Sequence, residues 1–133
     1  MEIIKQVIAL LSHKYSAFFV TTLIFVLCSM PTKGITKSIK SDIIVKSNLD
    51  KVAHFLAFAA WAFCWQFVYK NYINTLLIGV AYGILIEVWQ DMMPGKYKRV
   101  FSWYDALADA IGVVAGLLAY YIAQLLISQY IPV

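Results

Sequence analysis

Long stretches without charged side chains divide the chain into apolar blocks. Residues 15–32, 52–69, 71–86 and 110–133 contain no Asp, Glu, Lys or Arg. A helix needs roughly 20 mostly apolar residues to cross a bilayer. The pattern therefore predicts four membrane-spanning helices, at about residues 15–30, 51–69, 72–92 and 102–128. The alternation with period two that a strand would require is missing.

Helix-ending and helix-starting signals support these boundaries. The first predicted helix stops at Pro31, since the residue before a proline disfavours the helical region. It can extend upstream through the apolar residues 7–11. The third helix ends at the turn signal Pro94-Gly95. Ser102 and Asp105, three residues apart, fit an N-terminal cap for the fourth helix. We expect one all-α domain over residues 1–133, an integral membrane four-helix bundle.

Composition agrees with a membrane protein. The 133 residues are 62% hydrophobic and 14% charged, with a mean hydropathy of +0.76. So small a globule cannot bury this many apolar residues, which excludes a soluble monomer. The pI near 9.1 comes from lysines beside the predicted helices, whose natural anionic partner is lipid. Membrane lipids are therefore the expected partners, and nucleic acid is not.

The cations lie mainly on one side of the membrane. Four crossings place both termini and the loop at Lys70 on one side, with three cations (Lys5, Lys14 and Lys70). The opposite side carries eight (Lys33, Lys37, Lys40, Lys46, Lys51, Lys96, Lys98 and Arg99). The positive-inside rule places the second group in the cytoplasm. If some of these cations bind lipid phosphate instead, they do not report orientation.

Small, aromatic and sulfur-containing residues indicate how the helices pack. The pairs Gly79/Gly83 and Gly112/Gly116 have the spacing that brings membrane helices close together. Cys28 is expected at a different depth from Cys64, so a disulfide is not predicted. Most aromatic residues are expected to anchor the protein at the lipid interface (Trp61, Trp65, Trp89, Tyr97, Trp103 and Tyr104).

Acidic residues inside the predicted spans give the strongest functional signal. Ionisable groups in a membrane usually face the bundle interior or a watery cavity. At 1.5 Å per residue, His54 lies about 5 Å into the second predicted helix, and Glu87 lies about 8 Å from the end of the third. Asp105 and Asp109 lie about 5 and 10 Å into the fourth. All four are measured from the side of the two basic loops, so three helices are expected to form one shallow polar layer.

Helical spacing assigns faces and candidate roles. Asp50 shares a face with His54, Glu87 with Gln90 and Asp91, and Ser102 with Asp105 and Asp109. The catalytic candidates are His54, Glu87 and Asp105. The binding candidates are Asp50, Lys51, Gln90, Arg99, Ser102 and Asp109. Simpler roles are open as well: Asp50 and Ser102 as helix caps, and His54 as an interfacial residue.

Three short motifs in this layer resemble the VanZ-like family of small bacterial membrane proteins, over roughly residues 20–125. They are Asp50-Lys51-x-x-His54-Phe55, Glu87-x-x-Gln90, and Arg99-x-x-Ser102-x-x-Asp105-x-x-Ala108-Asp109-x-x-Gly112. One departure is Asp109, where the family usually has Asn. The resemblance implies a multi-pass protein of the bacterial cytoplasmic (inner) membrane that acts at the cell envelope. It also implies a link to resistance against the glycopeptide teicoplanin, because the family is named for such a member.

Four hypotheses about function are compatible with these residues. The favoured one is recognition or modification of a lipid or lipid-linked head group, including anionic lipids and lipid-linked cell-wall precursors. Arg99 and Lys51 suit a phosphate, and His54 with Glu87 suits acid/base chemistry. A metal-dependent enzyme using His54, Glu87 and Asp105 is the second, although no local ligand spacing is present and no metal or other cofactor is predicted.

An ion-coupled carrier and a purely structural polar network are the remaining hypotheses. A carrier would use the buried acids as an ion pathway. However, the half of the fourth helix away from the layer offers few polar residues, so a continuous pore in a monomer is not expected. Whether the protein is an enzyme, and its oligomeric state, do not follow from the sequence.

Overall fold

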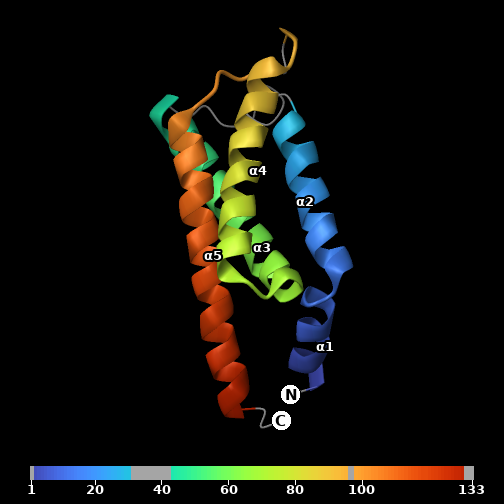
Figure 1. Cartoon of the computed structure of the whole chain (residues 1–133). Helices are drawn as coiled ribbons and strands as arrows, with labels where there is room; N and C mark the ends of the chain where they lie inside the picture. Colours follow the sequence, from blue (N-terminus) through green and yellow to red (C-terminus); the bar gives the residue numbers. More distant parts are fainter. Residues whose placement is uncertain (1, 31–42, 96–97, 131–133) are drawn as a thin grey trace.

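The computed structural model describes residues 2–30, 43–95 and 98–130, and helices account for nearly all of them (Figure 1). The helices are α1 (Glu2–Leu11), α2 (Lys14–Ser29), α3 (Ile43–Tyr69), α4 (Tyr72–Met92) and α5 (Trp103–Tyr130). The predicted all-α membrane bundle is confirmed. Three helices are long and apolar enough to cross a membrane, and α1 with α2 makes a fourth if the bent pair is one span.

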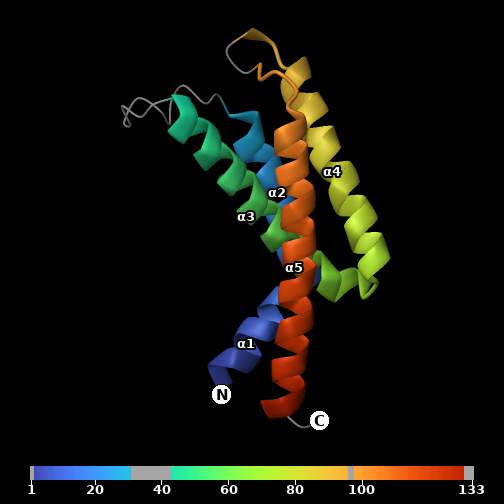
Figure 2. The same cartoon turned by 90° about the vertical axis from the view of Figure 1, so that its left-hand side faces the viewer.

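The first predicted helix consists of two segments. A bend of 62° separates α1 from α2, and α1 leaves the bundle at an angle (Figure 2). The bend lies at Ser12 and His13, where the side chain of His13 caps α2 by accepting from the backbone N–H of Tyr15. Two consecutive polar residues offer local partners for the backbone, so the helix can break there.

The second predicted helix begins earlier than expected. Instead of starting near residue 51, α3 starts at Ile43, before its apolar part at Asn48–Tyr69. The prediction was based on the apolar run alone, and the first turns of α3 precede that run, so they were not included. Asp50 consequently lies inside α3, and its interpretation as an N-cap is wrong. By contrast, α4 has the predicted bounds, and Ser102 caps α5 by accepting from the Asp105 backbone N–H at 3.3 Å.

The closest helix contact joins α3 and α5. A Cβ added at Gly112 would collide with the backbone carbonyl of Phe55, and one at Gly116 with that of Ala59. Only glycine leaves room for two backbones at this distance. On α4, a Cβ added at Gly79 would collide with the side chain of Val113 on α5. Both glycine pairs therefore lie at helix contacts, as predicted.

Helix α2 is attached to the bundle through Thr21. Its hydroxyl accepts hydrogen bonds from the indole N–H of Trp61 at 3.0 Å and of Trp65 at 2.8 Å. Its backbone carbonyl accepts from the Tyr82 hydroxyl at 2.8 Å. Trp61 and Trp65 are buried, so their expected role as lipid anchors is wrong, since their N–H groups need partners inside the protein.

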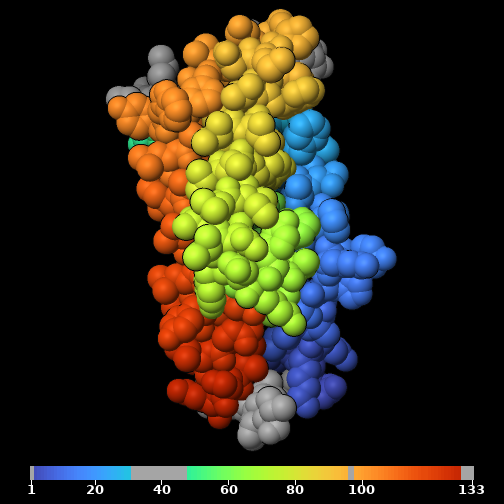
Figure 3. Space-filling model, in the orientation of Figure 1, coloured from blue at the N-terminus to red at the C-terminus, as the bar shows by residue number. Residues whose placement is uncertain are grey.

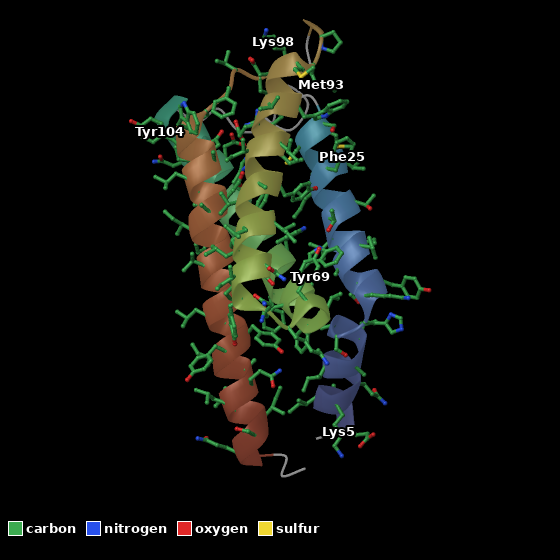
Figure 4. All side chains as sticks on the ribbon, in the orientation of Figure 1. Lys5, Phe25, Tyr69, Met93, Lys98 and Tyr104 are labelled. Carbon is green, nitrogen blue, oxygen red and sulfur yellow. The ribbon has the colours of Figure 1, made fainter. Side chains whose placement is uncertain are left out.

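Other aromatic and cysteine predictions are borne out in part. Trp103 and Tyr104 are exposed at the start of α5, consistent with an interfacial position, and Tyr104 points outward in Figure 4. Tyr97 lies outside the described residues. Cys28 and Cys64 are free thiols, as expected.

Both ends of the bundle can be identified in the figures. α1 begins and α5 ends at one end, while Met93 and Lys98 mark the other (Figures 1 and 4). On the face shown in Figure 3, α4 lies between α5 and α2. The connection between α3 and α4 is a tight turn in which Lys70 takes a positive φ of 52°. Pro31, Lys33, Lys37, Lys40 and Lys96 lie outside the described residues, so the structure does not test the predicted orientation.

Candidate functional site

Charged side chains from three segments meet near the end of the bundle that carries Lys98. We call Asp50, Arg99 and Asp105 the outer cluster. The guanidinium of Arg99 bonds the Asp50 carboxylate and lies 3.9 Å from an Asp105 oxygen. Arg99 belongs to the segment between α4 and α5, so this contact ties that segment to α3. One cation shared by two carboxylates leaves the outer cluster with an excess of negative charge when both acids are ionised.

A second group lies one helical turn further along α3 and α5, away from the end of the bundle that carries Lys98. We call His54, Glu87 and Asp109 the inner cluster. The Nδ1 atom of His54 lies 2.8 Å from an Asp109 oxygen in a hydrogen bond. His54 is 5% exposed, Glu87 1% and Asp109 0%. One ligand-type atom from each of the three residues lies within 4.8 Å of the others.

Backbone and side-chain hydrogen bonds connect α4 to this region. The backbone N–H of Ser102 donates to Glu87 Oε2 at 3.1 Å. The backbone N–H of Arg99 donates to the carbonyl of Gln90 at 3.0 Å, and the Gln90 amide donates to the carbonyl of Cys28 at 3.0 Å. Gln90 thus joins α2 to the segment that carries Arg99 and positions the Arg99 backbone.

Three buried oxygens near these contacts accept no hydrogen bond from any described residue. They are Glu87 Oε1, Gln90 Oε1 and Asp109 Oδ2. Asp109 Oδ2 lies against Gly83, where an added Cβ would come within 3.0 Å of it. Buried polar groups without a partner are costly and therefore uncommon. Two of the three belong to the inner cluster.

A cavity of about 260 Å³ lies between α2 and α3, beside both clusters. Its charged end is formed by Asp50, His54 and Arg99. The remaining lining is mostly apolar (Ile24, Leu27, Cys28, Met30, Ala53, Ala57 and Phe58). Glu87, Asp105 and Asp109 do not line it, so His54 is the residue that belongs to both the cavity and the inner cluster. A charged end with an apolar body matches the division of an amphipathic molecule.

The predicted polar layer forms, with different pairings from those expected. His54 bonds Asp109 rather than Glu87, so the sequence-based acid/base pair is not a hydrogen-bonded pair in the structure. Lys51 follows Asp50 on α3 and is half-buried, and Asp91 belongs to neither cluster. The proposed metal set of His54, Glu87 and Asp105 is replaced by two others, in which His54 joins either Asp50 and Asp105 or Glu87 and Asp109.

A family model described as VanZ/LLP1 matches residues 6–124, which include every candidate residue of the polar layer. The chain belongs to the VanZ/LLP1 family. A search of curated proteins and a search of solved structures give no significant match. Membership of the VanZ/LLP1 family, together with the apolar helices, identifies a multi-pass membrane protein.

Some parts of the candidate site in this VanZ/LLP1 family member gave no signal in the sequence. The α2 wall of the cavity consists of ordinary apolar residues, and Cys28 among them accepts the Gln90 hydrogen bond through its backbone carbonyl. Further from the layer, the buried Thr75 hydroxyl lies 2.6 Å from Gln66 Oε1. That pair falls within two apolar runs and was missed, although Gln66 is an uncharged polar residue in a predicted span and could have been noticed for that reason.

Proposed function

We propose that this protein binds the polar head group of a membrane lipid or lipid-linked molecule in the cavity between α2 and α3. The observation that carries the proposal is the division of the cavity lining into a charged end and an apolar body. A head group would lie against Asp50, His54 and Arg99, while the chain would lie along α2. Ligand sites typically combine such apolar walls with a few polar groups.

A phosphate-bearing head group is the ligand class that this lining favours. The guanidinium of Arg99 offers planar donors that match a phosphate. In the structure it is bonded to Asp50, so a phosphate would have to compete with that carboxylate. Asp50, once released, could accept from an amine or hydroxyl of the same head group. Anionic lipids and lipid-linked cell-wall precursors both contain this chemistry, and we propose them as the partners.

Photocrosslinking tests the proposal. The purified protein is placed in vesicles that contain a trace of photoactivatable phosphatidylglycerol or of a photoactivatable isoprenoid-linked phosphate. We expect labelled peptides from α2 and α3. Ala57→Phe fills the cavity from α3 and should remove most of the label, whereas Ala81→Phe adds the same side chain to the exposed face of α4 and should not. Equal labelling of the two variants would contradict binding in this cavity.

Action at the cell envelope is the second part of the proposal. The cavity and the polar layer lie at one end of the bundle, which suits a ligand taken from one side of the membrane. Modification of the ligand, as opposed to binding alone, would change the envelope lipid profile of cells that carry the protein, and Glu87→Gln should reverse the change. Unchanged profiles together with crosslinking would restrict the function to binding.

The proposed link to teicoplanin rests on the family resemblance alone. Expression in a susceptible bacterium should raise the minimum inhibitory concentration of teicoplanin, and Arg99→Gln should abolish the increase. No increase with the native protein would remove the glycopeptide from the proposal without affecting lipid binding.

A further inference from the structure

We propose that His54, Glu87 and Asp109 bind a divalent metal ion of the Zn²⁺ or Mn²⁺ class inside the bundle. The three side chains come from α3, α4 and α5, and each is at least nine-tenths buried. Their nearest ligand-type atoms lie within 4.8 Å of one another. In tetrahedral geometry, ligand atoms that stand about 2.0–2.2 Å from one ion lie about 3.3–3.6 Å apart, so binding requires the three side chains to close in by up to about 1.5 Å.

Unpaired oxygens supply an independent argument. Glu87 Oε1 and Asp109 Oδ2 are buried and accept no hydrogen bond from the described residues. Gln90 Oε1, one helical turn from Glu87, is in the same state. A protein interior normally leaves few such atoms. A cation bound between α4 and α5 would satisfy the carboxylate oxygens at once.

Charge balance also favours a cation. Two ionised carboxylates and a neutral imidazole carry a charge of −2, which a divalent ion neutralises. No guanidinium is bonded to the inner cluster, since Arg99 is paired with Asp50 and lies beside Asp105. In the alternative set of Asp50, His54 and Asp105, Asp50 is already bonded to Arg99 and Asp105 lies 3.9 Å from it, so the guanidinium would repel a metal ion.

The donor set defines the class of metal. One imidazole and two carboxylates suit Zn²⁺ and Mn²⁺ better than a thiolate-seeking metal. The two cysteines belong to neither metal-ligand group, although the backbone carbonyl of Cys28 accepts from Gln90. His54 also lines the cavity, so a bound ion would lie next to the proposed head-group site. Metal binding itself does not depend on the proposed lipid function.

Direct titration tests the metal site. The detergent-solubilised protein is treated with a chelator, returned to metal-free buffer and titrated with Mn²⁺ while free Mn²⁺ is followed by electron paramagnetic resonance. We expect one ion per chain, and Zn²⁺ should compete for it. Pulsed measurements should show ¹⁴N modulation from the imidazole, which His54→Gln should remove. A native protein that takes up neither ion at concentrations up to about 1 mM, the range of the weakest specific binding, would overturn the proposal.

Matched variants locate the ion. Glu87→Gln and Asp109→Asn keep the side-chain shape and should weaken Mn²⁺ binding at least tenfold, since even outer-shell changes at metal sites cost about 10–100-fold. Asp91→Asn, on the same helix as Glu87 but in neither cluster, should leave binding within about threefold. Asp105→Asn should weaken binding less than Glu87→Gln and Asp109→Asn do, because Asp105 supplies no ligand atom to this set. Loss of binding in Asp105→Asn alone would place the ion in the other set and refute the proposal. Circular dichroism and the elution volume check folding for each variant.

Two variants distinguish a failure of the metal-site proposal from a failure of the lipid-binding proposal. Ala57→Phe alters the cavity but removes no proposed ligand atom, so it should reduce lipid crosslinking and retain Mn²⁺ binding. Asp109 does not line the cavity, so Asp109→Asn should retain crosslinking in metal-free buffer and lose Mn²⁺ binding. Loss of both activities in both variants would show that the substitutions disturb a single site and would contradict the separate metal site.

Discussion

His54 on α3 and Asp109 on α5 are joined by a hydrogen bond of 2.8 Å between two side chains that are almost fully buried. The bond links helices whose backbones already touch at Gly112, three residues further along α5. If His54 Nδ1 donates to the carboxylate, the imidazole has a fixed tautomer and a fixed ring orientation. In that tautomer Nε2 is the ring nitrogen that remains able to accept a proton or bind a metal ion.

Two substitutions of Asp109 distinguish the effect of its charge on stability from the effect of its hydrogen bond. Asp109→Asn retains an oxygen that can accept from His54 and removes a buried charge, so the free energy of unfolding in chelator should change by less than about 1 kcal/mol. Asp109→Leu removes the acceptor and should cost about 1–3 kcal/mol, because the imidazole is left unpaired. Thermal unfolding in detergent measures both. A loss as large for Asn as for Leu would mean that the charge itself stabilises the bundle.

Removal of the Thr21 hydroxyl should weaken the attachment of α2. Thr21→Val has nearly the same shape but leaves the indole N–H groups of Trp61 and Trp65 without an acceptor, at a cost of about 1–3 kcal/mol for each buried group left unpaired. Thermal unfolding and tryptophan fluorescence measure this effect. Thr21→Ser restores the hydroxyl and should restore most of the stability. Equal stability of the Val and Ser variants would contradict a role for these bonds.

Addition of one methyl group to Gly112 should force α3 away from α5. Gly112→Ala improves intrinsic helix propensity by about 1 kcal/mol, yet its Cβ collides with the Phe55 carbonyl. We expect a net loss of about 1–3 kcal/mol, as for other overpacked interfaces. The control is Gly95→Ala, where nothing lies within 4 Å and the positive φ of 58° is the source of strain. Only Gly112→Ala should alter cysteine crosslinking between α3 and α5.

Ser102 has a structural role that can be distinguished from ligand binding. Its hydroxyl caps α5, whereas its contact with Glu87 uses the backbone N–H. Ser102→Ala should therefore cost about 0.5–2 kcal/mol, the usual value for a cap, and leave the Glu87 contact in place. Ser102→Thr keeps a capping hydroxyl without adding a charge and should restore stability. If Ala reduces lipid crosslinking more than it reduces stability, the hydroxyl contacts the ligand.

Much of the architecture could be predicted because the membrane makes hydropathy decisive. The charge-free runs identified the helices, and α4 has the predicted bounds from Tyr72 to Met92. The rise per residue also predicted that His54, Glu87, Asp105 and Asp109 would form one shallow polar layer. In each case a one-dimensional property of the chain, length or spacing, determined the result.

The pairings could not be predicted, because they depend on the rotation of each helix about its axis. Spacing i,i+4 places Asp50 and His54 on one face without saying which neighbour that face meets. Asp50 meets Arg99, and His54 meets Asp109. Likewise, Trp61 and Trp65 looked like interfacial anchors because their acceptor, Thr21, lies 40 and 44 residues away in the sequence.

The backbone contact between α3 and α5 determines where the cavity can change size. At Gly112 and Gly116 no side chain separates the two helices, so sliding or spreading of this pair would open an unfilled gap. α2 instead contacts the bundle through side chains, including those that bond Thr21 and the Gln90 amide that bonds the Cys28 carbonyl, and it begins at a sharp bend. We expect α3 and α5 to behave as one rigid body and α2 as the wall that moves. The dimensions of an accepted ligand would then depend on how far α2 can swing about residues 12–13.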